Sequence, residues 1–114
     1  MKMFFYGTLK QDCSRSVADR LLRGEKLIGK VNTSSKYRLF TNGAFPGMIE
    51  DEKGVAVPGE LWEVSEQAVP RLDAYEGHPH LFKRGPVEID GHSDVQTYFW
   101  CGSTEGRREI PNWV

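Results

Sequence analysis

The sequence has few cysteines, almost no net charge and no long hydrophobic run. Its two cysteines, Cys13 and Cys101, are far apart among 114 residues, so they suggest neither a metal-spaced cluster nor a disulfide framework. A formal net charge of -1 gives no electrostatic basis for binding nucleic acid or an acidic membrane surface. No apolar stretch approaches the roughly 20 residues that span a bilayer, and no signal-peptide pattern opens the chain. We therefore expect a cytoplasmic protein with two free thiols, no nucleic-acid partner and no membrane partner.

The length and composition are typical of one globular domain. The chain is long enough for a single core, and its hydrophobic content of 39% is ordinary for a folded protein rather than a disordered one. About six or seven short strand patterns alternate with only two helical patterns. A doubly wound sheet needs a helical crossover between most of its strands, so two helices are too few for it. Short strands with frequent turns favour a barrel or a strongly curled sheet. The sequence therefore predicts an α+β domain over residues 1–114.

The strand patterns differ in how buried they should be. The first should lie centrally in the sheet, because Met3, Phe4 and Phe5 are consecutive and apolar. Pro46 predicts an edge strand or an irregular strand, because proline cannot donate to a sheet ladder. Asp90-Gly91 predicts the tight turn of a hairpin. The other expected strands span Lys26 to Val31, Lys36 to Thr41, Gly59 to Val64, Phe82 to Ile89 and Ser93 to Trp100.

Two segments have helical patterns. The first runs from about Arg15 to Arg23, with Ser14 or Ser16 as its cap and Gly24 at its end. The second begins near Ser65 and is complicated by Pro70. Either this helix is kinked, or its regular part begins at Pro70, in the first-turn position that proline favours.

Tyr6-Gly7-Thr8-Leu9 is the first candidate functional stretch. It follows an apolar strand and should turn sharply there, with Gly7 permitting an unusual φ and a close approach of the backbone to a ligand. Free backbone N–H groups at such a turn suit a carboxylate or a developing oxyanion. These four residues are therefore candidates for binding substrate.

Leu72-Asp73-Ala74-Tyr75-Glu76-Gly77 is the second candidate stretch. It places Glu76 at the exit of the second helix, with Gly77 as the expected cap, so that a general base would stand near a loop. Asp73 is more typical of a solvated or structural charge. Glu60 and Glu63 are weaker rivals for the same role.

Other chemistry-bearing residues have plainer interpretations. Cys13 has no histidine near it in the sequence to activate a nucleophilic thiol. His78-Pro79-His80 lacks a third ligand at a convincing spacing, so a polar loop stiffened by proline is favoured over a metal site. Arg84 could pair with a substrate carboxylate, although a structural salt bridge is favoured. Phe45 and Met48 could line a cavity or fill the core.

The ordered pair of candidate stretches resembles the γ-glutamylcyclotransferase-like (AIG2-like) family, which carries Tyr-Gly-Ser/Thr-Leu after its first strand and a catalytic glutamate much later. LDAYEG followed by Pro79, Phe82 and Arg84 is similar to the γ-glutamylamine cyclotransferase branch, and the FPGM and GELWEV segments are also similar. The resemblance covers roughly residues 3–100. It leaves residues 102–114 as a C-terminal extension wrapped on the surface.

This resemblance implies a fold and an activity. The fold would be a small mixed β-barrel with the two helices packed outside. The activity would be cyclisation of a small γ-glutamyl amine or γ-glutamyl amino compound to 5-oxoproline, a lyase or transferase reaction without metal or cofactor, with Glu76 as general acid and base. Residues 11–16 depart from the family's usual glycine- and asparagine-containing loop. The alternative is a non-catalytic module that binds a small ligand on the same barrel. The leaving amine and the oligomeric state stay open.

Overall fold

A computed structural model describes residues 1–114 of the chain. Eight strands and two helices follow one another along the chain, so the fold is α+β with one strand more than the six or seven expected. Their bounds are β1 Lys2–Phe5, α1 Ala18–Leu21, β2 Lys26–Asn32, β3 Tyr37–Thr41, β4 Pro46–Glu50, β5 Pro58–Glu63, α2 Val69–Glu76, β6 Phe82–Ile89, β7 His92–Trp100 and β8 Arg108–Ile110.

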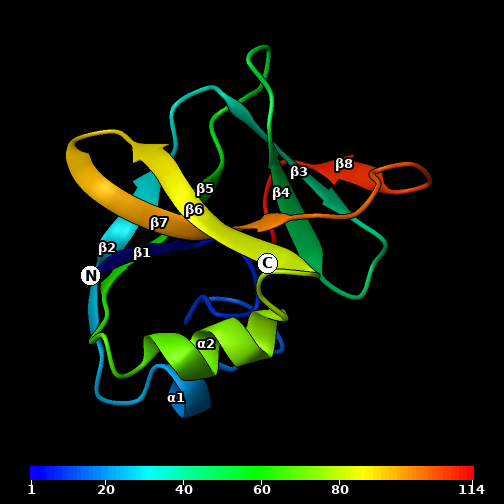
Figure 1. Cartoon of the computed structure of the whole chain (residues 1–114). Helices are drawn as coiled ribbons and strands as arrows, with labels where there is room; N and C mark the ends of the chain where they lie inside the picture. The colour runs from blue at the N-terminus through cyan, green and yellow to red at the C-terminus, as the bar shows by residue number, and fades with distance from the viewer.

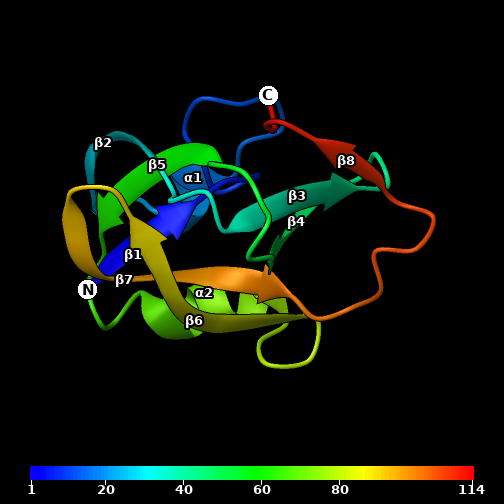
Figure 2. The same cartoon turned by 90° about the horizontal axis from the view of Figure 1, so that it is seen from above.

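The strands form two sheets (Figures 1 and 2). One has five strands in the order β2-β5-β1-β7-β6, and the other has three in the order β4-β3-β8. The five-stranded sheet curls until its two edges meet at one end, where Thr33 forms an isolated bridge with Ile89. The edges are not paired along their length, so the predicted barrel describes this sheet only loosely.

The central position of β1 is confirmed. This strand pairs antiparallel with β5 and parallel with β7, and its alternate side chains enter two different cores. Met3 and Phe5 pack with residues of both helices, whereas Phe4 and Tyr6 belong to the second core. Successive side chains of a strand point to opposite faces, so a strand covered on both faces has consecutive apolar residues.

The first helix is much shorter than predicted. Instead of Arg15 to Arg23, only Ala18–Leu21 is helical. Arg15 has φ 59, the left-handed region that a right-handed helix excludes. The N-cap residue is Val17, without a side-chain cap, whereas the predicted cap Ser16 lies one residue earlier and its hydroxyl accepts a hydrogen bond from the Ala18 N–H at 3.1 Å.

The second helix begins where the proline rule places it. α2 runs from Val69 to Glu76 with Pro70 in its first turn, so the unkinked alternative is the correct one. Gly77 follows with φ 66, and its N–H donates to the carbonyl groups of Asp73 and Ala74. This left-handed glycine ends the helix immediately after Glu76. Neither α2 nor α1 has the length and apolarity that crossing a bilayer requires.

The C-terminal segment differs most from its prediction. Arg108–Ile110 form β8 and pair antiparallel with β3, so the segment completes the second sheet rather than only wrapping the surface. The last residues then fold against the loop that follows the Tyr6–Leu9 turn. The Lys10 ammonium donates to the Trp113 carbonyl, and the Ser14 hydroxyl donates to a Val114 oxygen at 3.0 Å.

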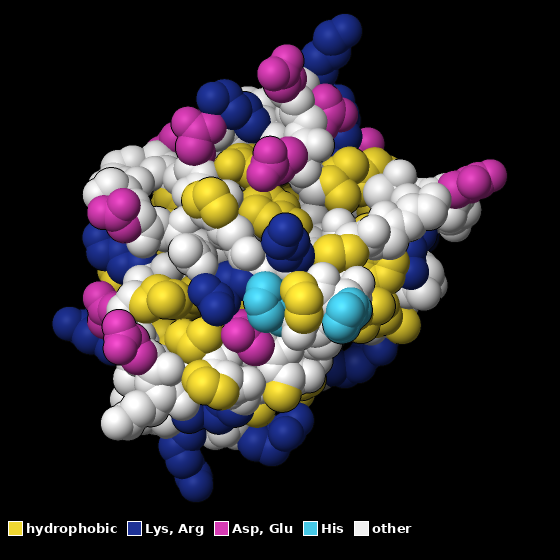
Figure 3. Space-filling view, in the orientation of Figure 1, with side chains coloured by type: hydrophobic (Ala, Val, Ile, Leu, Met, Phe, Trp, Pro, Cys, Tyr) yellow, Lys and Arg dark blue, Asp and Glu magenta, His cyan; other side chains and the backbone are white.

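The remaining predictions of strand pairing are confirmed. β6 and β7 form the expected hairpin, and Gly91 in its turn has φ 80. β4 begins at Pro46 and lies at the edge of its sheet. On the face seen in Figure 3, acidic and basic side chains are interspersed. The protein also contains ion pairs between the two signs, such as Lys36–Glu88 at 2.8 Å.

Candidate functional site

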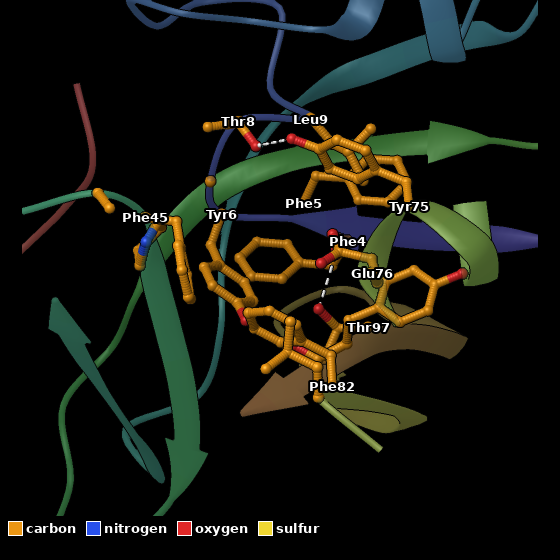
Figure 4. Close-up of a pocket in the computed structure, with 15 residues that line it drawn as sticks. Phe4, Phe5, Tyr6, Thr8, Leu9, Phe45, Tyr75, Glu76, Phe82 and Thr97 are labelled. Carbon is orange, nitrogen blue, oxygen red and sulfur yellow. Dashed lines mark hydrogen bonds between the residues drawn. The ribbon is translucent and has the colours of Figure 1, made fainter. Parts of the chain in front are cut away.

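The two candidate stretches meet at a cavity of about 290 Å³ (Figure 4). The turn after β1 forms one wall, and the C-terminal end of α2 forms another. Five segments contribute all of the lining, namely residues 4–9, 44–46, 75–76, 81–82 and 97–98. The fold therefore joins parts of the chain that are up to about ninety positions apart into one site.

Exposure divides the lining into a floor and a rim. The floor contains the rings of β1 together with Phe82 and Tyr98, all of which are buried. The exposed members, Ala44, Tyr75 and Leu81, form what we call the rim. A ligand would enter over the rim and reach Glu76 below it.

Glu76 is the only charged residue that lines the cavity. It is half-buried, it lies in the middle of the surrounding side chains in Figure 4, and its carboxyl has no hydrogen-bond or ion-pair partner in the protein. Burial raises the pKa of this carboxyl from 4.5 to about 7, because a low-dielectric surrounding disfavours the charged form. Such a group can take up and release a proton near neutral pH.

The turn at residues 7–9 offers free donors. The Gly7 carbonyl accepts from the Lys10 N–H at 2.9 Å, and the Thr8 carbonyl accepts from the Val17 N–H at 2.9 Å. The backbone N–H groups of Gly7, Thr8 and Leu9 have no acceptor within the protein. Because all three residues also line the cavity, the turn can present unpaired donors to an anionic ligand.

The reason for glycine at position 7 differs from the prediction. The φ of Gly7 is not in the left-handed region, so the turn needs no unusual φ there. The structure also shows a close approach to Pro46, since a Cβ on Gly7 would lie 2.8 Å from the Pro46 Cγ. This contact joins the turn to the start of β4, where Pro46 also lines the cavity.

The hydroxyl groups of the lining are mostly occupied. Thr8 and Tyr75 share a hydrogen bond of 2.8 Å that links the turn to α2 (Figure 4). The Tyr6 hydroxyl donates to the Tyr98 carbonyl at 2.6 Å and accepts from the Met48 N–H at 3.1 Å. The predicted binding residue Tyr6 therefore lines the cavity with its ring, while its hydroxyl is hydrogen-bonded to the backbone of β7 and β4.

A network of polar side chains adjoins the cavity through Tyr98, which is one of the lining residues. Asp73 accepts from the Arg84 guanidinium at 3.1 Å and from the Tyr98 hydroxyl at 2.6 Å. Although burial raises the pKa of Asp73, these two hydrogen bonds outweigh it and hold that pKa below 3.8. The predicted structural salt bridge of Arg84 is confirmed. His78 belongs to the same network, because its Nδ1 accepts from the Arg84 N–H at 3.0 Å.

The rival carboxylates lie elsewhere. Glu60 is buried and accepts hydrogen bonds from the N–H groups of Gln11 and Asp12, at 2.6 and 3.0 Å. These bonds hold the loop of residues 11–16 against β5. Glu63 binds the terminal amine of Met1 at 2.6 Å. Neither lines the cavity.

Cys13 also stands outside the cavity. Its thiol donates to the carbonyl groups of Gly7 and Lys10 at 3.6 and 3.5 Å, and burial raises the pKa of that thiol. Both features favour a thiol that supports the turn over a reactive thiolate.

Sequence reasoning missed part of the lining. Phe45 lines the cavity, as one alternative held, but Met48 is fully buried in the core. Leu81, Phe82 and Thr97 were not anticipated there. The tertiary structure brings them to the site; Phe82 was noted only as part of the family-like segment, and no local pattern marked Leu81 or Thr97.

Comparison with known proteins gives a consistent result. The sequence model of the family described as "Gamma-glutamyl cyclotransferase, AIG2-like" matches residues 3–113, so the match extends through the C-terminal segment beyond residue 100. "Putative gamma-glutamylcyclotransferase MJ1514" of Methanocaldococcus jannaschii is 32% identical over 86% of this chain and 81% of its own length. A "Putative gamma-glutamylcyclotransferase" of Vibrio cholerae is 33% identical over 75% of this chain and 70% of its own. The crystal structure of a mouse AIG2-like protein (Mus musculus) superposes with a TM-score of 0.84 at 22% identity, covering 99% of this chain and 87% of the mouse chain, and shows the same fold.

Proposed function

Because the chain belongs to the gamma-glutamyl cyclotransferase, AIG2-like family, we propose that it converts a γ-glutamyl compound into 5-oxoproline and a free amine. The family and the homologues support γ-glutamylcyclotransferase activity in general. One observation carries the finer proposal: an unpartnered carboxylate with a pKa of about 7 shares a cavity with a turn whose backbone N–H groups are free.

Substrate binding follows from the charges of a γ-glutamyl group. Its α-carboxylate, or the oxyanion that forms at the γ-carbonyl, would accept hydrogen bonds from the N–H groups of Gly7, Thr8 and Leu9. Its α-ammonium would face the Glu76 carboxylate. Tyr6 would contribute its ring to the floor, because its hydroxyl is already occupied.

The reaction needs two proton transfers through Glu76 and the loss of one further proton. Glu76 takes a proton from the α-ammonium, and the resulting amine attacks the γ-carbonyl carbon to form the new C–N bond of a five-membered ring, with an oxyanion and a positively charged ring nitrogen. The ring nitrogen releases its extra proton to solvent, the oxyanion collapses as the bond from this carbon to the leaving nitrogen breaks, and Glu76 returns its proton to that leaving nitrogen. One positioned carboxyl that acts as base and then as acid contributes on the order of 10²–10⁴-fold to such a reaction.

The ring closure is intramolecular, so the enzyme need only hold a folded conformer of the substrate. Well-oriented intramolecular reactions recover much of the barrier through proximity. The Thr8–Tyr75 hydrogen bond, at 2.8 Å, would keep the turn and α2 at the separation that this conformer requires. No metal or cofactor takes part in the proposed steps.

The test is product release from a panel of γ-glutamyl compounds, analysed by mass spectrometry. We expect 5-oxoproline and the free amine in equal amounts from at least one compound. Binding of several compounds, seen as a thermal shift, without any 5-oxoproline would favour a non-catalytic binding module instead.

A further inference from the structure

A second pocket, of about 600 Å³, borders the loop that follows the Tyr6–Leu9 turn. It shares no lining residue with the cavity at Glu76. The C-terminal segment lies beside this loop (Figure 2) and completes the pocket. The lining consists of residues 10–14, 30–32 and 58–60 together with Asn112 and Val114, and three of these thirteen residues are hydrophobic. A ligand there would therefore be recognised through hydrogen bonds and charge.

Lys10 is the cation that this pocket leaves without a counter-charge. It is 8% exposed, an unusual burial for a lysine. Its ammonium donates to the Trp113 carbonyl and makes no ion pair. Because an ammonium has three donors, two of them have no acceptor in the protein. A buried charge is costly unless it is paired and hydrogen-bonded, so Lys10 needs an anion that the chain does not supply.

The two carboxylates of the pocket are bound elsewhere. Glu60 accepts hydrogen bonds from two backbone N–H groups of the loop and from the Trp62 indole, at 2.6, 3.0 and 3.1 Å. Asp12 pairs with the exposed Lys30 at 2.8 Å. Each carboxylate therefore has its own donors, and neither forms an ion pair with Lys10.

The same two carboxylates limit the charge of a ligand. One negative group on the ligand would be compensated by Lys10, but a second would be repelled by Asp12 and Glu60 without another unpaired cation to offset the repulsion. The lining also contains the carboxamides of Gln11, Asn32 and Asn112. Carboxamides both donate and accept hydrogen bonds, so they suit a ligand whose remaining groups are polar.

We propose that this pocket binds a small, polar organic acid with a single carboxylate, which pairs with the Lys10 ammonium. At roughly 30 Å³ for each water molecule, 600 Å³ corresponds to about twenty waters, so the pocket has room for an acid the size of a six-carbon sugar acid. The proposal does not depend on the reaction assigned to Glu76, because the two sites have separate linings.

Three compounds with the same six-carbon polyol chain separate the effect of charge from that of the hydroxyl groups. D-Gluconate has one carboxylate, D-sorbitol has none and D-glucarate has two. NMR titration of the isotope-labelled protein gives a Kd for each compound and locates the site through the amide shifts. We expect gluconate to bind at least about tenfold more tightly than either of the others, because hydrogen bonds to charged groups contribute at least that factor. The shifts should change at residues 10–14 and 112–114.

Substitution of the lysine tests the ion pair. Lys10→Met removes the ammonium and keeps the length of the side chain, so it should raise the Kd for gluconate by at least about tenfold. The unliganded variant should be no less stable than the wild type, because it loses a buried and unpaired charge. Lys26→Met is the matched control, since Lys26 is an exposed lysine of β2 outside the pocket, and it should leave the Kd unchanged. Asn112→Ala, which leaves Lys10 in place, should raise the Kd a few-fold.

The outcomes separate the parts of the proposal. Equal binding of sorbitol and gluconate, or an unchanged Kd in Lys10→Met, refutes the ion pair, and tighter binding of glucarate refutes the single charge. No saturable binding of gluconate at tens of millimolar refutes the site. Shifts confined to residues 7–9 and to the cavity at Glu76 would also refute it, by assigning the carboxylate to that cavity. If Lys10→Met does not fold, an unchanged Kd in Asn112→Ala refutes the site and a raised Kd supports it. None of these results bears on whether 5-oxoproline is formed.

Discussion

Glu76 should destabilise the folded protein at neutral and alkaline pH. Its carboxyl is held without a partner beside apolar rings, and burial raises its pKa from 4.5 to about 7. A group placed for proton transfer rather than for stability often has this cost. Glu76→Gln keeps the size of the side chain and removes its charge, so the variant should be more stable than the wild type where Glu76 is ionised.

The sign and size follow from the linkage between protonation and folding. A carboxyl whose pKa is higher in the folded state contributes stability that is complete below the unfolded value, 4.5, and is lost as the pH rises through about 7. At about 1.4 kcal/mol for each pKa unit, the loss is at most about 3–4 kcal/mol. Partial exposure of the side chain to water reduces this figure, so about 1–2 kcal/mol is the expected gain in Glu76→Gln at alkaline pH.

Thermal denaturation at two pH values measures the effect. At about pH 8.5 the Tm of Glu76→Gln should exceed that of the wild type by roughly 4–8 °C for each kcal/mol, and near pH 4.5 the two should coincide. Glu66→Gln is the matched control, because Glu66 is exposed and precedes the same helix. A Glu76→Gln variant no more stable than the wild type at the higher pH would refute the buried, unpartnered carboxylate.

Four further predictions test the site. The acidic limb of the kcat/KM profile should have an apparent pKa of about 7, the value for the Glu76 carboxyl, and NMR titration of that carboxyl should agree. Gly7→Ala should lose about 1–3 kcal/mol by urea denaturation and bind substrate less well, because its Cβ would crowd Pro46 at 2.8 Å. Thr8→Ser should be nearly neutral in both assays, and Thr8→Ala intermediate because it loses the 2.8 Å hydrogen bond to the α2 tyrosine. Asp73→Asn should cost about 1–3 kcal/mol at neutral pH, a difference that shrinks as the pH falls through the low pKa of Asp73 and the wild type loses the same charge.

Local sequence rules predicted the elements whose causes are local. The preference of proline for a first turn predicted where α2 begins, and the preference of glycine for a left-handed cap predicted where it ends. Glu76 was therefore correctly predicted to lie at the end of the helix. Consecutive apolar residues in β1 predicted a central strand, and the structure covers this strand on both faces. The predicted bounds of the first helix were wrong, because the apolar periodicity of the sequence does not reveal that Arg15 adopts a left-handed φ.

Features that depend on the tertiary structure were not predictable in this way. β8 lies in a charged segment without periodicity and is a strand because β3 offers it an open edge. The clash that explains Gly7 involves Pro46, nearly forty residues away. Likewise, nothing local to Leu81 distinguishes it from a surface leucine, and only the fold brings it to the same cavity as Glu76.

The proton transfer assigned to Glu76 is tested most directly by Glu76→Gln on a compound that the wild-type protein cyclises. Single-turnover release of 5-oxoproline should fall by about 10²–10⁴-fold, the contribution of one general acid–base group. Substrate binding, measured by calorimetry, should persist through the N–H groups of Gly7, Thr8 and Leu9. Release at the wild-type rate by a folded Glu76→Gln protein would contradict the mechanism.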